Sequence, residues 1–143
     1  LFGTTIIGAA IYGNFALFVQ LGDGDVLLLD QNDNAELIFQ ADEEMYGTVT
    51  YSLCQPSNAI HAKVRCMRLN APKLLLISTD GIRDSLQDDE QSYINVGRWL
   101  LRRLEKESWE ELSQALPAWL SELSLRGNGD DTTLGVIHWT KEE

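Results

Sequence analysis

Aspartates adjoin three of the apolar runs in this sequence. Asp23 follows the first of these runs, Asp80 follows the second, and Asp130, together with Asp131, precedes the last. The end of a buried strand holds a side chain on a rigid scaffold, and hard cations such as Mg²⁺ and Mn²⁺ prefer carboxylate oxygens as ligands. These aspartates could therefore bind such a metal. For any one of them the simpler interpretation is a turn, because Asp and Gly are ordinary turn residues.

The apolar runs themselves predict strands. Residues 6–11 and 15–21 form two runs joined at Gly13-Asn14, a dipeptide suited to positive φ in a hairpin turn. In residues 59–69, Val64 and Cys66 alternate with polar residues, which is typical of a half-exposed strand. The other predicted strands are residues 25–30, 35–40, 73–79 and 132–139.

Two helices are predicted between the last two strands. Apolar residues at helical spacing run from Tyr93 to Leu104. Ser108 and Glu111 form a capping-box sequence that begins the second helix, and Pro117 is expected to kink or split that helix. Many strands, two helices and a closing strand, in that order, predict an α+β fold with a mainly antiparallel sheet.

The composition disfavours several classes of protein. The 143 residues amount to one domain, and 11 Lys and Arg against 22 Asp and Glu give a net charge of 11 − 22 = −11. Nucleic acid is therefore an unexpected partner, because phosphate backbones bind basic patches. Residues 1–21 carry no charge, yet their glycines and the absence of preceding basic residues favour strands over a membrane helix or a signal peptide. Cys54 and Cys66 match neither a metal motif nor a disulfide framework, so we expect a cytoplasmic protein whose cysteines are buried structural residues.

Four short motifs follow one another along residues 3–133. They are Gly3-Thr4-Thr5, Leu21-Gly22-Asp23-Gly24, the segment 76–84 (LISTDGIRD) and Gly129-Asp130-Asp131-Thr132-Thr133. Their order and approximate spacing resemble those of the protein phosphatase 2C family, the metal-dependent serine/threonine phosphatases. The resemblance implies a sandwich of two antiparallel β-sheets flanked by α-helices. It also implies hydrolysis of phosphoserine or phosphothreonine in a phosphorylated protein substrate, by a water that two Mg²⁺ or Mn²⁺ ions activate.

The resemblance implies roles for three residues. By their places in the motifs, Asp80 and Asp130 resemble ligands of the catalytic metals, and Asp23 resembles a ligand of a third, weaker metal. Gly24 and Asp25 stand where the family has a Ser-Arg pair.

One motif of the family does not occur in these residues: Asp-Gly-x-Gly-Gly, which supplies the bridging metal aspartate. We therefore expect residues 1–143 to be a partial domain that lacks its N-terminal part and is inactive alone. The alternative is a non-catalytic relative that binds a phosphoprotein or a regulatory partner. Exposed sheet edges would favour self-association of such a partial domain. His61 and His138 are interpreted as structural or surface residues, because neither has a motif partner.

Overall fold

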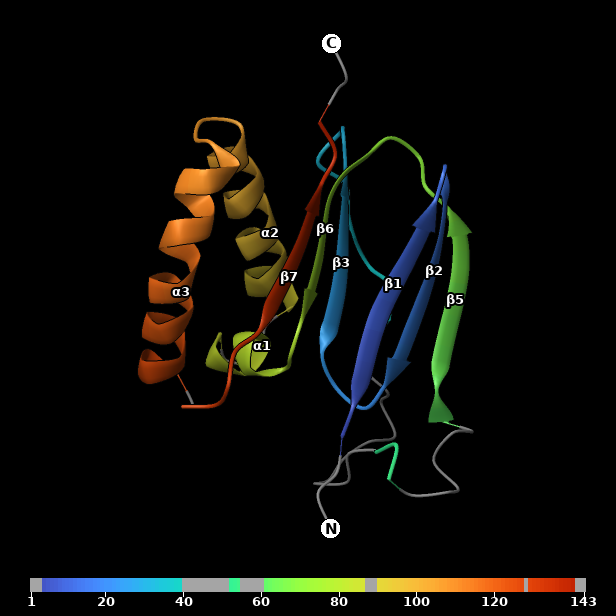
Figure 1. Ribbon diagram of the computed structural model, residues 1–143, viewed down its shortest axis with the longest axis horizontal. Helices are drawn as coiled ribbons and strands as arrows, with labels where there is room; N and C mark the ends of the chain where they lie inside the picture. The colour runs from blue at the N-terminus through green and yellow to red at the C-terminus, as the bar shows by residue number, and fades with distance from the viewer. Residues whose placement is uncertain (1–3, 40–51, 55–60, 87–89, 128, 141–143) are drawn as a thin grey trace.

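The computed structural model describes residues 4–39, 52–54, 61–86, 90–127 and 129–140. The strands are β1 (Ile6–Tyr12), β2 (Phe15–Leu21), β3 (Asp25–Asp30), β4 (Ala35–Leu37), β5 (Lys63–Arg68), β6 (Pro72–Ser78) and β7 (Leu134–His138). The helices are α1 (Gly81–Ser85), α2 (Glu90–Leu104) and α3 (Trp109–Arg126). A three-stranded antiparallel sheet has the order β1-β2-β5, and a four-stranded antiparallel sheet has the order β4-β3-β6-β7 (Figure 1).

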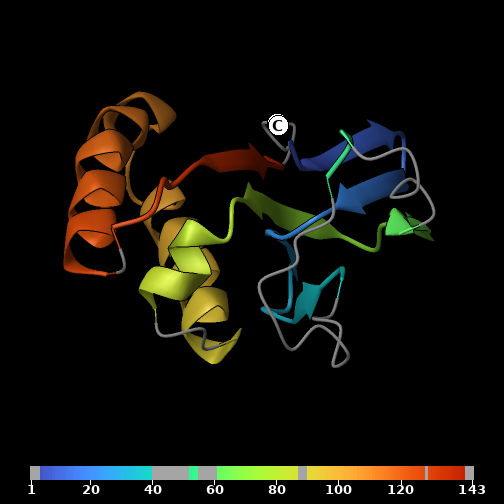
Figure 2. The ribbon, with the colours of Figure 1, turned by 90° about the horizontal axis from the view of Figure 1, so that it is seen from below.

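All three helices lie on one side of the sandwich. Figures 1 and 2 show them on the side of the four-stranded sheet that faces away from the three-stranded sheet. The described chain therefore has three layers, with the four-stranded sheet in the middle. The predicted α+β fold, with two antiparallel sheets and flanking helices, is confirmed.

Two apolar cores fill the spaces between the layers. One core joins the helices to the four-stranded sheet and includes Leu76 and Leu100. The other lies between the two sheets and includes Phe18 and Leu75. Strands β3 and β6 contribute to both cores, so their sequences are continuous apolar runs rather than alternations.

Helix α2 approaches the middle sheet closely at Gly97. A Cβ atom at this position would lie 2.6 Å from Leu27 Cδ2 and 3.3 Å from Leu29 Cδ1. Glycine is therefore the residue that lets the helix axis come this near to β3.

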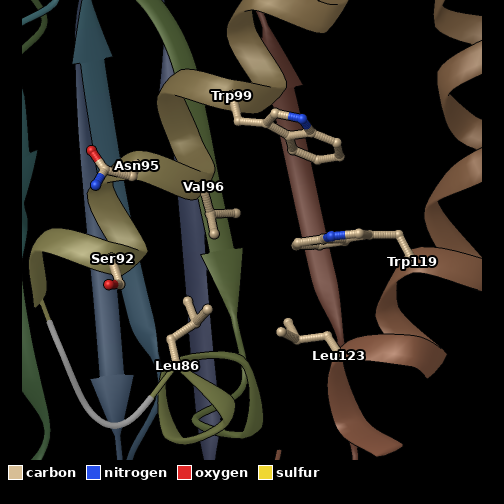
Figure 3. Close-up of a pocket in the computed structure, with 7 residues that line it drawn as sticks. All are labelled: Leu86, Ser92, Asn95, Val96, Trp99, Trp119 and Leu123. Atoms are coloured by element: carbon tan, nitrogen blue, oxygen red, sulfur yellow. The ribbon is translucent and has the colours of Figure 1, made fainter. Parts of the chain in front are cut away.

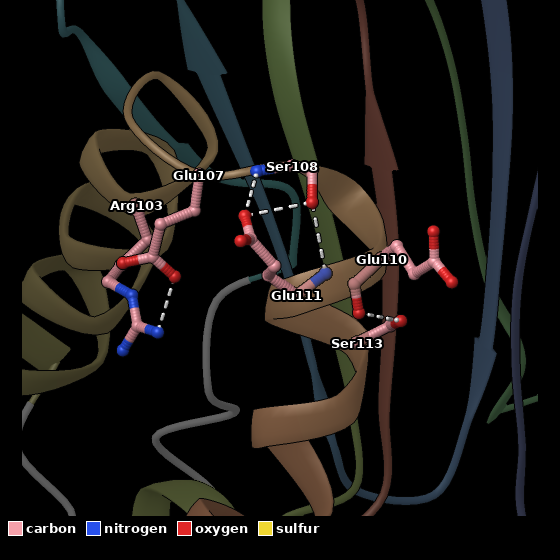
Figure 4. Close-up of polar contacts among 6 residues, drawn as sticks. All are labelled: Arg103, Glu107, Ser108, Glu110, Glu111 and Ser113. Atoms are coloured by element: carbon pink, nitrogen blue, oxygen red, sulfur yellow. Dashed lines mark hydrogen bonds and ion pairs between the residues drawn. The ribbon is translucent and has the colours of Figure 1, made fainter.

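Helix α3 begins at the capping box that the sequence predicts. The Glu111 backbone N–H donates to Ser108 Oγ (3.2 Å), and the Ser108 backbone N–H donates to Glu111 Oε2 (2.9 Å) (Figure 4). Pro117 lies inside this helix, which continues from Trp109 to Arg126, so the proline does not split it. Pro117 and Ser113, whose carbonyl loses its helical partner, are both exposed, and water can replace the missing hydrogen bond.

Other expectations from the sequence are corrected. The short helix α1 follows β6, where no helix was predicted. The predicted alternation of Val64 and Cys66 along a half-exposed strand is confirmed, and the face that they share is the outer, exposed face of the sheet, whereas Arg65 between them lies on the inner face. The expectation that Cys54 and Cys66 are buried is wrong, because both are exposed. Residues 40, 59 and 60, at the ends of two predicted strands, lie outside the described residues.

No helix in the described ranges has the length and apolar character needed to cross a membrane. The uncharged N-terminal stretch instead contains the β1–β2 hairpin, in which Tyr12 pairs with Phe15 across a turn at Gly13 (φ +56°).

The outer face of the three-stranded sheet is apolar and exposed. Along β2, Phe15 and Leu17 are exposed on this face, whereas Ala16 and Phe18 point inward and are buried. Among the described residues, no helix covers it. We call it the open face and define it by its exposed apolar side chains, Ile6, Tyr12, Phe15, Leu17 and Val64.

Candidate metal centre

Three connections of the chain meet at one end of the sandwich, at the bottom of Figure 1: β2 to β3, β6 to α1, and α3 to β7. Asp25 on β3 is the register partner of Ser78 on β6. Asp23 precedes Asp25 by two residues, and Asp80 follows Ser78 by two residues. Both strands therefore carry an aspartate just beyond the same end of their pairing.

Three carboxylates gather at this end. Oxygen atoms of Asp80, Asp84 and Asp130 all lie within 4.8 Å of one another. Asp84 follows Asp80 by one helical turn, which places the two side chains on one face of α1. Asp80 is half-buried, whereas Asp84 and Asp130 are exposed, so the group is open to a ligand from solution. We call these three residues the carboxylate group.

Hydrogen bonds hold the loop of Asp130 against the end of β6. The Thr79 backbone N–H donates to the Thr133 carbonyl (3.2 Å), and the Thr133 N–H donates to Thr79 Oγ1 (3.0 Å). Thr79 Oγ1 also donates to the Asp131 carbonyl (3.2 Å). On the other side of the loop, Ser124 Oγ of α3 donates to the Asp130 carbonyl (2.7 Å). The position of Asp130 therefore depends on β6, α3 and β7 together.

Gly81 allows this loop to approach. A Cβ atom at Gly81 would lie 2.5 Å from the Asp131 carbonyl oxygen, a backbone atom that cannot move aside cheaply. The glycine that follows Asp80 thus does more than permit a turn. It makes room for the backbone that brings Asp130 to Asp80.

Negative charges repel one another within the carboxylate group. Burial raises the pKa of the Asp80 carboxyl above its ordinary value, and the negative charges of Asp23, Asp84 and Asp130 raise it further. A hydrogen bond from the Gly81 backbone N–H lowers this pKa and only partly offsets the increase. A bound cation would relieve the repulsion among these carboxylates.

The predicted residues are therefore placed as follows. The structure brings Asp80 and Asp130 into one group. Asp23 is not one of the three residues of that group, but its negative charge is among those that raise the pKa of Asp80. Sequence reasoning missed Asp84, although its spacing of four residues from Asp80 was visible.

The donor set fits a hard divalent cation. The carboxylate group offers only oxygen atoms, and carboxylate oxygens with remaining water ligands suit Mg²⁺ and Mn²⁺ better than metals that prefer nitrogen or sulfur. His138 pairs with Leu74, at the far end of β6 from Ser78, and His61 is exposed.

A shallow groove of about 370 Å³ lies between α2 and α3. Figure 3 shows Trp99 of α2 and Trp119 of α3 facing each other along it, and their rings stack with centroids 5.1 Å apart. Among the described residues, none that lines this groove is ionisable, so we place the chemistry at the carboxylate group.

Comparison with known proteins identifies the family. The family profile described as protein phosphatase 2C matches residues 1–121. The chain belongs to the protein phosphatase 2C family. The matched residues include Asp23, Asp80 and Asp84, whereas Asp130 lies beyond them. No curated protein matches the sequence.

Solved structures with this phosphatase fold are similar over almost the whole chain. A bacterial serine phosphatase has a TM-score of 0.68 and 18% identity, over 97% of this chain and 54% of that one. The catalytic domain of the serine/threonine phosphatase PstP, in complex with two manganese ions, has a TM-score of 0.60 and 21% identity, over 94% and 57%. The phosphatase domain of SpoIIE from Bacillus subtilis has a TM-score of 0.55 and 18% identity, over 98% and 58%. The chain thus spans about half the length of these solved structures.

Proposed function

We propose that this chain supplies metal-binding carboxylates of a protein serine/threonine phosphatase. The observation that carries the proposal is the carboxylate group, three oxygen ligands within 4.8 Å at one end of a phosphatase 2C sandwich. In this proposal Asp80, Asp84 and Asp130 hold Mg²⁺ or Mn²⁺ at the catalytic centre, and Asp23 contributes to a third, weaker site. The solved relative with two manganese ions supports this choice of metal.

The proposed substrate is a phosphorylated protein, and the family and the charge of the site support this choice. When bound, the divalent ions supply Lewis acidity that activates a water as the nucleophile and stabilises charge during in-line displacement at phosphorus. The carboxylates of this chain would hold the ions in place, and the bound cations would offset the repulsion that raises the pKa of Asp80. A phosphorylated protein would otherwise be repelled by a chain of net charge −11.

We propose that residues 1–143 form part of one phosphatase 2C domain and show no turnover alone. Support comes from the share of the solved relatives that they match, which is 54 to 58% for the three described above. If full-length protein hydrolyses a phosphopeptide with Mn²⁺ and Asp80→Asn abolishes turnover, the alternative of a non-catalytic binding module is excluded. Full turnover by the 143-residue chain would show that it is not partial.

Metal binding is the direct test. We expect isothermal titration of the protein with Mn²⁺ to show binding that Asp80→Asn weakens by more than about a hundredfold, because loss of outer-shell partners alone costs about 10- to 100-fold. Asp33→Asn is the matched control. Asp33 is an exposed aspartate in the turn between β3 and β4, at the other end of β3. Equal Mn²⁺ affinities of the two variants would contradict the proposal.

We also propose that the chain associates with a second copy through the open face. The outward positions of β1, β2 and β5 include no acidic residue, so two such faces can meet without bringing carboxylates into contact. Light scattering over a range of concentrations should show association that Leu17→Lys abolishes. Leu125→Lys, at an exposed leucine of α3, should leave association unchanged. A monomer at every concentration would refute the proposal.

We propose a cytoplasmic location. Cys54 and Cys66 are free and exposed, a state that a reducing compartment maintains.

A further inference from the structure

A largely buried ion pair joins helix α1, which carries Asp84, to strand β3. Arg83 Nη1 donates to Asp25 Oδ1 at 2.9 Å, and the Asp25 side chain is only 2% exposed. Arg83 lies on α1 between Asp80 and Asp84, and Asp25 lies two residues after Asp23. The pair therefore joins the two chain segments that carry Asp23 and the first two carboxylates of the group.

The surroundings of Asp25 hold this end of β3 in one position. Ser78, its register partner, shares a buried hydrogen bond of 2.8 Å with the Tyr93 hydroxyl. Gly24 has φ +118°, and a Cβ atom there would lie 2.6 Å from the Ser78 carbonyl oxygen. The Gln20 side-chain amide donates to the Gly24 carbonyl (2.7 Å). The turn that carries Asp23 is thus fixed by two contacts, from Gln20 to the Gly24 carbonyl and from Arg83 to Asp25.

This pair differs from other ion pairs of the described chain. Arg65–Glu36 and Lys73–Glu105 are partly exposed surface pairs, whereas Asp25 has left solvent almost completely. Removing a charge from water costs more free energy in a buried pair than in a surface pair. The attraction within a buried pair often only offsets that cost. A gain in the free energy of unfolding therefore explains this ion pair poorly. A constraint on the positions of the two segments that it joins explains it better.

We propose that Asp25 and Arg83 are positioning residues that hold the turn of Asp23 and helix α1 at the spacing a divalent cation requires. The inference rests on the proposed function, because the pair positions metal ligands. It adds two residues that do not touch the metal themselves and act through Asp23, Asp80 and Asp84. In this proposal Asp25, which stands where the family has an arginine, has a role in positioning the metal ligands.

Positioning and simple electrostatics predict different signs. If the two residues acted only through their charges, removal of the Arg83 cation would tighten Mn²⁺ binding, and removal of the Asp25 anion would weaken it. If they act by positioning, loss of either partner releases the same constraint. Both single variants should then bind Mn²⁺ more weakly.

The experiment measures the Mn²⁺ dissociation constant of Asp25→Asn and Arg83→Met by isothermal titration, with circular dichroism to show that each variant is folded. We expect both constants to rise by about 10- to 100-fold, the effect typical of residues that orient metal ligands. Arg83→Lys should recover part of the affinity, because it keeps the charge near Asp25. Arg65→Met is the matched control and should leave the constant unchanged, because it removes the ion pair with Glu36 and the hydrogen bond to the Ile38 carbonyl from β5, a strand that carries none of the carboxylates.

A double variant covers the case in which a single variant does not fold. Asp25→Leu with Arg83→Met removes both buried charges, a replacement that folded proteins often tolerate. We expect it to fold and still to lose about 10-fold or more in Mn²⁺ affinity.

The outcomes separate the two proposals. Unchanged Mn²⁺ affinity in the folded variants, or tighter binding by Arg83→Met, would overturn the positioning inference and leave the proposed function standing. An unvaried protein that does not bind Mn²⁺ would overturn the proposed function, and the inference with it.

Discussion

The two sheets of the sandwich differ in what lies on their outer faces. Leu76, on β6, points toward the helices and is fully buried. Leu17 occupies an outward position on β2, the central strand of the other sheet, and is 42% exposed. The residue type is the same in both places, so the difference comes from the neighbouring layer.

The carboxylate group belongs to the covered half of the molecule. Asp80 and Asp84 extend from β6 and α1, and Asp130 is held by α3 and β7. Only Asp23 comes from a turn between the two sheets. The carboxylate group thus lies at the end of the sheet that is packed on both faces, which gives its side chains a rigid support. The other sheet keeps an exposed apolar face, to which we assign the proposed self-association.

The largest expected difference between the halves is in stability. Leu76→Ala should lower the free energy of unfolding by about 3 kcal/mol, because it leaves a cavity in the covered core. Leu17→Ala should lower it by less than about 1 kcal/mol, because much of that side chain is already in solvent. Urea denaturation measures both values. Equal losses would mean that the open face is as well covered as the helical one.

Two glycines provide a sharper comparison. Gly97→Ala should destabilise the protein by about 1–3 kcal/mol, since the new Cβ would meet Leu27 at 2.6 Å and the core is already filled. Gly8→Ala, in β1, should be neutral or stabilise by about 0.5–1 kcal/mol, because no atom lies within 4 Å of that Cβ and a strand loses less entropy with alanine. Thermal unfolding of the two variants, side by side, tests this. Destabilisation by Gly8→Ala would indicate a covering layer over β1.

The helix cap tests whether the covered half responds as a unit. Ser108→Ala removes the acceptor for the Glu111 backbone N–H and should cost about 1 kcal/mol. Hydrogen exchange should then become faster in α3 and β7, and remain the same in β1 and β2. Equal acceleration in both sheets would show that the two halves unfold together.

The smallest expected effect is a pH dependence at the edge of the covered sheet. Burial lowers the pKa of His138 below its ordinary value, the nearby Lys73 cation lowers it further, and Glu105 partly opposes them. The unfolded chain therefore binds the proton more readily, and stability is lost as the pH falls from the ordinary histidine pKa to the lowered one. Urea denaturation at pH 7.5 and 5.5 should show a smaller acid loss for His138→Gln than for the exposed control His61→Gln.

Much of this fold could be predicted from local signals in the sequence. The turn at Gly13 and the capping box at Ser108 each depend on neighbouring residues only, and the structure contains both. Helix α1 was missed because five residues are too few for a helical period to become visible. Asp84 was missed with it, since the spacing from Asp80 gains meaning only once the backbone between them is helical.

The face of a strand is a different kind of problem. The alternation of Val64 and Cys66 is local, but the choice of inner face depends on the layer that packs against β5. There, Arg65 points inward and donates to the Ile38 carbonyl (3.0 Å), which keeps its head hydrogen-bonded while the valine remains outside. Likewise, the approach of Asp130 to Asp80 depends on Gly81 and on a loop about fifty residues away, which no local pattern encodes.

The bond between Thr79 and Thr133 joins segments 54 residues apart, with the α2–α3 hairpin between them. Closing so long a loop costs chain entropy before Asp130 can reach its partners, so we expect the carboxylate group to be completed late in folding. A cation that needs Asp130 would bind the native chain and not its precursors, and would stabilise it by mass action. Under the proposed function, the time at which Mn²⁺ begins to bind during refolding would therefore mark the time at which the α2–α3 hairpin has packed and brought Asp130 to Asp80.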